Sequence, residues 1–123
     1  VYVSSESGSP EVYLTRFPGG GGKWQVSVNH GFCPIWSRSG DEIFYREEDT
    51  LMAVTVKTDP SPVLGTPQPL FRADEKGLIL RQRAFDIMPD GRHFVAVKLL
   101  EKESGRDQIV VVTNWHSEFE KAE

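Results

Sequence analysis

Two ten-residue segments, at residues 35–44 and 86–95, share one pattern of residue types at an offset of 51 residues. In both, an apolar stretch runs into a polar turn that contains a glycine, Gly40 or Gly91, and an aromatic and aliphatic stretch follows. Tight turns between antiparallel strands favour glycine because they need a residue with positive φ. The repeat therefore predicts two hairpins of the same kind within a fold made of repeated units.

Short stretches rich in β-forming residues extend this pattern along the chain. The ten strands that we expect lie at residues 1–3, 11–17, 24–28, 34–37, 43–45, 51–56, just before Phe71, 84–87, 93–99 and 109–113. Trp24, Val26 and Val28 alternate onto one face of their strand. The stretch 109–113 is the most apolar, which predicts burial on both of its faces.

These strands group into three units, at about residues 1–28, 33–72 and 84–115, and the first unit lacks its first strand. Antiparallel meanders of four strands and about 40–45 residues have the size of a β-propeller blade. A proline-rich connection at 59–69 and an insertion near 76–80 account for the longer offset. We expect an all-β partial β-propeller of about two and a half to three blades. A polar tail at 116–123 follows, with helical composition that allows a short C-terminal helix.

Composition limits the partners of this chain. Its 123 residues include 11 glycines and 8 prolines, too many turn-forming residues for long helices. The net charge of −4 comes without a basic stripe, which argues against nucleic-acid binding. No apolar run reaches the roughly 18 residues of a membrane helix, so we expect no membrane insertion within this segment. The single cysteine, Cys33, excludes an internal disulfide.

Residues 88–92, Met-Pro-Asp-Gly-Arg, are close to a Ser-Pro-Asp-Gly box followed by a strand. Residues 36–40 are a weaker copy without the proline and the aspartate, and residues 1–8, 11–14 and 23–27 add context. The chain resembles the TolB-like (WD-type) β-propeller repeat family over residues 1–115. In many relatives such a region forms the last blades of a longer propeller, often the extracytoplasmic part of a bacterial serine/threonine protein kinase. The resemblance implies a propeller fold and favours a periplasmic or extracytoplasmic location.

Fewer than three full blades leave a structural problem, because a closed propeller typically has 4–8 blades. The incomplete outer units should expose strand edges. Two hypotheses follow. The chain is a fragment of a larger propeller, or it covers its open blade edges by self-association.

Four glycines at 19–22 followed by Lys23 resemble a phosphate-binding loop only superficially. Such a loop requires a further glycine where Phe17 stands and a serine or threonine where Trp24 stands. It also opens a helix, whereas a strand is expected here. We interpret this segment as a flexible connection between strands.

Cys33 and the three histidines are the remaining candidates for catalysis or metal binding. Cys33 lies three residues after His30, but loop spacing does not enforce the contact that thiolate activation needs. We therefore interpret Cys33 as a small packed residue. His30, His93 and His116 lack the spacing of a metal site, and no Gly-x-Ser-x-Gly motif occurs. We expect no metal, no cofactor and no enzymatic activity.

Several aromatic and acidic residues also receive structural interpretations. Packing between units is expected for three tryptophans, Trp24, Trp36 and Trp115. Hydrogen bonds to the backbone of nearby turns are expected for three aspartates, Asp41, Asp86 and Asp90.

A binding surface, where present, should lie on the loops at one rim of the units, because the sheets free these loops from packing duties. The candidate binding residues on these loops are His30, Phe32, Arg46, Arg81 and Arg83. We expect a non-catalytic protein-interaction or sensory module, with a protein or a second copy as partner. The alternative is a propeller-type enzyme, or an accessory domain of a peptidase or other hydrolase. Among such enzymes, lactonase-like propellers hold a metal in a closed central channel.

Overall fold

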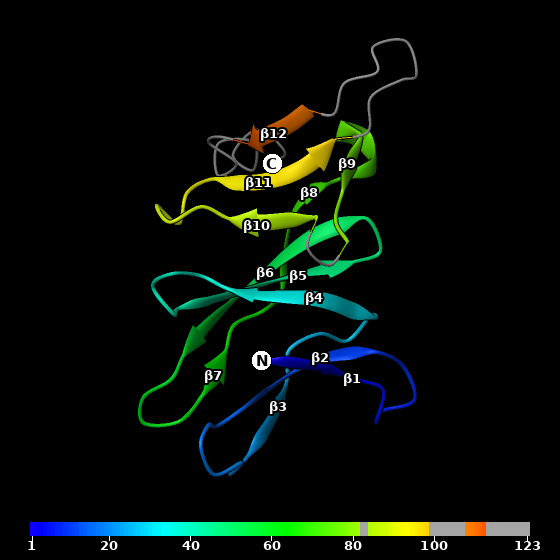
Figure 1. Cartoon of the computed structure of the whole chain (residues 1–123). Helices are drawn as coiled ribbons and strands as arrows, with labels where there is room; N and C mark the ends of the chain where they lie inside the picture. Colours follow the sequence, from blue (N-terminus) through cyan, green and yellow to red (C-terminus); the bar gives the residue numbers. More distant parts are fainter. Residues whose placement is uncertain (82–83, 99–107, 113–123) are drawn as a thin grey trace.

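The computed structural model of the chain describes residues 1–81, 84–98 and 108–112. These residues form twelve strands in three antiparallel sheets, with one short 3-10 helix, η1, at Asp74–Lys76. Figure 1 shows the sheets stacked one on another, from the first near the N-terminus (blue) to the third (yellow). The predicted all-β antiparallel fold is therefore confirmed.

The first sheet has the order β1-β2-β3, with β1 at Tyr2–Ser4, β2 at Glu11–Thr15 and β3 at Lys23–Gln25. The second follows the order β4-β5-β6-β7, and β8 also pairs with β6. Its strands are β4 at Gly31–Trp36, β5 at Glu42–Glu47, β6 at Thr50–Lys57, β7 at Val63–Leu64 and β8 at Gln68–Arg72.

The third sheet has the order β10-β11-β12, and β9 also pairs with β11. Its strands are β9 at Leu78–Ile79, β10 at Phe85–Ile87, β11 at Phe94–Lys98 and β12 at Gln108–Val112. The sequence did not predict β7 and β9, because each is a two-residue strand inside a segment assigned to a connection. β9 also joins the insertion near 76–80 to the third unit, and β4 begins at Gly31 rather than at residue 33.

The internal repeat is present in the backbone. Gly40 and Gly91 have positive φ, at 75° and 67°. Each glycine N–H donates to the carbonyl three residues earlier, that of Ser37 at 3.1 Å or of Met88 at 2.9 Å. The residue pairs flanking the two turns are equivalent at the same offset, Trp36 with Ile43 and Ile87 with Phe94.

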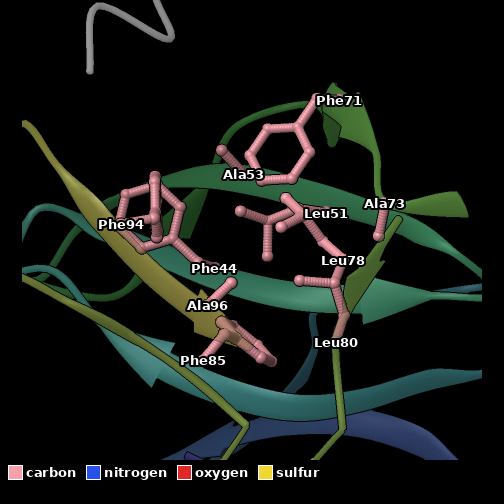
Figure 2. Packing of buried hydrophobic residues seen from close by; sticks show 10 residues of the cluster. All are labelled: Phe44, Leu51, Ala53, Phe71, Ala73, Leu78, Leu80, Phe85, Phe94 and Ala96. Carbon is pink, nitrogen blue, oxygen red and sulfur yellow. The ribbon is translucent and has the colours of Figure 1, made fainter. Parts of the chain in front are cut away.

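The second sheet is buried on both faces because β5 alternates between two apolar clusters. Phe44 points to the cluster shared with the third sheet, whereas Ile43 and Tyr45 belong to the cluster shared with the first sheet. The buried members of the former, drawn in Figure 2, are Phe44, Leu51, Ala53, Phe71, Ala73, Leu78, Leu80, Phe85, Phe94 and Ala96. Within it, the Phe44 and Phe94 rings meet edge to face, with centroids 5.0 Å apart.

The other cluster joins the first two sheets. Its buried members are Val12, Leu14, Val26, Ile43, Tyr45, Met52, Val54 and Val56. Trp24 and Trp36 are partly buried against this cluster, which confirms the packing interpretation for these two residues. Trp115 lies outside the described residues, as does the predicted C-terminal helix.

Two expectations about strands were wrong, the extent of the strand at residues 24–28 and the burial of the strand at residues 109–113. Val28 is 67% exposed because β3 ends at Gln25, so the alternation that places Trp24 and Val26 against the core does not continue to residue 28. Val111 in β12 is 47% exposed, whereas burial on both faces was expected. The third sheet packs on the second through only one of its faces, and Val97 of β11 is likewise exposed.

Candidate functional site

The start of β4 and the end of β5 lie side by side and bring two predicted binding residues into contact. Phe32 pairs with Arg46 in the strand register. The guanidinium carbon of Arg46 lies 5.1 Å from the centre of the Phe32 ring. A guanidinium over an aromatic face is held by electrostatic attraction to the ring and by stacking. The orientation of Arg46 is therefore set by a neighbour that accepts no conventional hydrogen bond from it.

A pocket of about 310 Å³ joins this arginine to a second predicted residue, Arg81. It lies between the β5–β6 turn and the segment that runs from η1 through β9. The residues that line it are Arg46, Asp49, Asp74, Gly77, Leu78, Ile79, Leu80 and Arg81. Phe32 and Arg46 were expected on loops but lie in β4 and β5, because pairing between these strands extends to their ends. Arg46 contacts Phe32 and also lines this pocket with Arg81, so the fold links three of the five predicted binding residues.

The charges in this pocket differ in how they are satisfied. Arg72 donates to both carboxylate oxygens of Asp74, at 3.1 and 2.7 Å, and this contact lowers the pKa of Asp74. Arg46 is different, because its Nε is buried and has no hydrogen-bond partner. Across the described residues, neither Arg46 nor Arg81 forms an ion pair with a carboxylate. Two arginines thus line this pocket, and their side chains have no acceptor among the described residues.

His30 directly precedes β4, and among the described residues its backbone rather than its side chain forms a hydrogen bond. It has a φ of 64°, and its N–H donates to Glu11 Oε1 at 3.0 Å. The side chain does not line the pocket. The fifth candidate, Arg83, and the loop at 102–106 lie outside the described residues.

Glu11 is an important residue that the sequence analysis missed. It is only 3% exposed, and its carboxylate accepts hydrogen bonds from Ser27 Oγ and from the N–H groups of His30 and Gly31. Burial alone raises the pKa of Glu11, but these hydrogen bonds outweigh it and hold the pKa below its ordinary value. The carboxylate thus fixes the segment that leads into β4. A lone acidic residue in an otherwise apolar strand was the available signal.

A second groove, of about 520 Å³, lies where end strands of the three sheets approach one another. The residues that line it are Val1, Tyr2, Val3, Phe32, Cys33, Pro34, Ile35 and Phe85. Burial raises the pKa of Cys33, although Arg46 acts in the opposite direction. The raised pKa disfavours the thiolate, and Cys33 packs against the cluster shared by the second and third sheets, as its packing interpretation expects.

The other sequence interpretations can be compared with the structure. Residues 19–22 connect β2 to β3, and Lys23 forms an ion pair with Glu6 at 2.7 Å, as suits a strand connection. The predicted backbone hydrogen bonds exist for Asp86, which accepts from the Ile87 N–H, and for Asp90 in the second hairpin turn. The carboxylate of Asp41 instead accepts from two serine hydroxyls, those of Ser37 and Ser39.

Among the residues that the structure describes, no group of three histidine, cysteine, aspartate or glutamate side chains could hold a metal ion. The same residues contain no helix of the length and apolar character that crossing a membrane requires.

Comparison of this chain with family models, with curated proteins and with solved structures finds no match. The resemblance to TolB-like repeats and the propeller architecture therefore stay predictions, and the site must be judged on its own geometry.

Proposed function

We propose that the chain is a non-catalytic protein-interaction module of the β-propeller type, which contacts its partner through the rim around Arg46 and Arg81. The observation that carries the proposal is the state of Arg46. Its guanidinium is oriented by Phe32 and has no acceptor among the described side chains, and the residue lines a pocket together with Arg81. Arginine and aromatic residues are enriched at protein interfaces.

The stacked sheets support the same proposal. The second sheet is packed on both faces, so Phe32 in β4 and Arg46 in β5 sit on a rigid base. Arg81 lies outside the strands, on a connection that does not fill the core. The proposed module is one part of a larger propeller, or it associates with a second copy through its open strand edges. The extracytoplasmic location implied by the family resemblance belongs to this proposal as well.

The enzymatic alternative receives no specific support from the part of the chain that is described. A lactonase-like site requires metal ligands gathered from several blades, and the described side chains provide no such cluster. The cysteine nucleophile is disfavoured by the raised pKa of Cys33. The interaction module is therefore the function that this site supports best.

Selection from a random peptide library on the immobilised full chain tests this proposal. Peptides selected on the wild type should bind Arg46→Ala and Arg81→Ala at least fivefold more weakly, with the thermal unfolding midpoint unchanged. Arg92→Ala is the matched control, because Arg92 is an exposed arginine in the turn between β10 and β11. Equal binding to all three variants, or a library that yields no binder, would contradict the proposal.

A further inference from the structure

We infer that the pocket between Arg46 and Arg81 binds the carboxylate side chain of an acidic peptide segment. This inference rests on the proposed interaction function and names the chemistry of the partner. It begins from the charged residues that line the pocket. Two arginines have no acceptor among the described residues, and the two aspartates differ in their partners.

Arg46 is prepared for an external anion. Stacking on Phe32 holds the guanidinium in place, so little side-chain freedom remains to be lost when a ligand binds. Its Nε is shielded from water without a hydrogen bond, and no described acceptor uses the rest of the group. A planar guanidinium with free donors matches the two oxygens of a carboxylate. Arg81 supplies a second positive charge to the same pocket.

The two aspartates of the pocket decide which kind of anion fits. Asp74 is already bound at both oxygens by Arg72, and its charge is thereby offset. The carboxylate of Asp49 has no hydrogen-bond or ion-pair partner among the described residues and also lines the pocket. Asp49 is exposed, so a ligand that offers a donor to Asp49 as well as an acceptor to the arginines complements both charges of the pocket. A peptide has both, because its main-chain N–H groups accompany the side-chain carboxylate.

The remaining lining favours a peptide over a nucleic acid. Ile79 lines the pocket and is partly exposed, which suits an aliphatic residue next to the acidic one, whereas Leu78 and Leu80 are buried in the core. A nucleic acid would instead present a row of phosphates to a surface that includes Asp49, on a chain with a net charge of −4. Such a surface lacks the run of positive charges that polyphosphate binding requires.

Two peptides of equal shape test the inference. The probes are acetyl-Ala-Leu-Glu-Leu-Ala-amide and the same peptide with glutamine in place of glutamate, titrated into the full chain carrying ¹⁵N-labelled arginine. Hydrogen bonds to charged groups are worth about 1.5–3 kcal/mol, so the glutamate peptide should bind about tenfold or more tightly. The Arg46 Nε–H resonance should shift with the glutamate peptide. Arg46→Gln should remove the preference, Arg46→Lys should restore only part of it, and Arg92→Gln should retain it.

Equal affinity for the two peptides would overturn the inference, as would a preference that survives in Arg46→Gln. Tighter binding of a five-nucleotide oligothymidylate than of the glutamate peptide would also overturn it. Failure of the carboxylate specificity can be told apart from failure of the proposed interaction function. If library peptides without acidic residues bind the rim and lose affinity in Arg46→Ala, the interaction module stands while the carboxylate specificity falls.

Discussion

Ser37 and Asp90 cap the same two backbone positions in the two copies of the repeated hairpin. Ser37 Oγ accepts hydrogen bonds from the N–H groups of Asp41 and Glu42, at 3.2 and 3.0 Å. In the second copy, Asp90 Oδ1 accepts from Arg92 and His93, at 2.9 and 3.2 Å. With the 51-residue offset, these donors are equivalent, yet the two acceptors are not. One turn uses its first residue and the other uses the residue before its glycine.

Because the two turns use acceptors at different positions, a serine at position 88 should replace the acceptor lost when Asp90 is removed. Asp90→Ala removes the acceptor of the second turn and should lower the thermal unfolding midpoint, because the Arg92 and His93 N–H groups lose their partner. Met88 occupies the position equivalent to Ser37, so adding Met88→Ser to Asp90→Ala should recover part of the loss. Calorimetry on the single and double variants measures the effect. Met88→Ala in the same background is the control, and recovery by alanine equal to that by serine would contradict the capping explanation.

Gly31 should tolerate no side chain. An added Cβ would lie 2.2 Å from Ser27 Oγ and 2.9 Å from Val12 Cγ2, both in a tightly packed region. Gly31→Ala should therefore destabilise the chain by about 1–3 kcal/mol, measured by denaturant unfolding. Gly21→Ala is the matched control, since a Cβ there meets nothing within 4 Å. Similar stabilities of the two variants would show that the space around Gly31 is not limiting.

Glu11 should make stability depend on pH. Because its folded pKa lies below the ordinary value of 4.5, its contribution is present above that value and is lost as pH falls through the folded pKa. Glu11→Gln should cost about 1–3 kcal/mol at pH 7, and the difference from the wild type should shrink below pH 4.5. Denaturant unfolding at several pH values measures this. Glu48→Gln, at an exposed turn position, should show no such trend, and a constant difference for Glu11→Gln would argue against the linkage.

Phe94 should be essential for joining the third sheet to the second. It is 1% exposed, and its ring contacts that of Phe44 edge to face. Phe94→Ala should cost about 3–5 kcal/mol in unfolding experiments, because a large buried side chain leaves a cavity. Val111→Ala, on the exposed face of the same sheet, should change stability by only about 0.5 kcal/mol. A large effect at Val111 would instead indicate that another surface covers this face.

Expectations based on turns and on side-chain alternation agreed well with the structure where a strand was long enough. The alternation expected from residue 24 onward holds at Trp24 and Val26, which both pack in the cluster shared by the first two sheets. The same reasoning was wrong at Val28, because strand length depends on pairing with a neighbour, and β3 ends at Gln25. Two-residue strands such as β7 and β9 carry too little periodic signal to be recognised.

For the candidate site, the sequence likewise predicted some features and not others. The sequence placed Phe32, Arg46 and Arg81 on loops expected at one rim. The structure instead has Phe32 and Arg46 in paired strands, where they stack, and Arg46 shares a pocket with Arg81. Neither the stacking of Arg46 on Phe32 nor its missing acceptor could be predicted, because both depend on neighbours that are distant in the chain. Glu11 was missed for the same reason, since its partner N–H groups lie 19 and 20 residues away.

The sequence by itself determined the local chemistry of the repeated hairpins. Gly40 and Gly91 supply the positive φ that each turn needs, and alternation along β5 decides which residues face each cluster. Only the tertiary structure decided that Glu11 holds the entry to β4 and that Arg46 shares a pocket with Arg81. The physical reason is distance along the chain: turns and alternation act between near neighbours, whereas burial and unpaired donors arise only when whole sheets pack together.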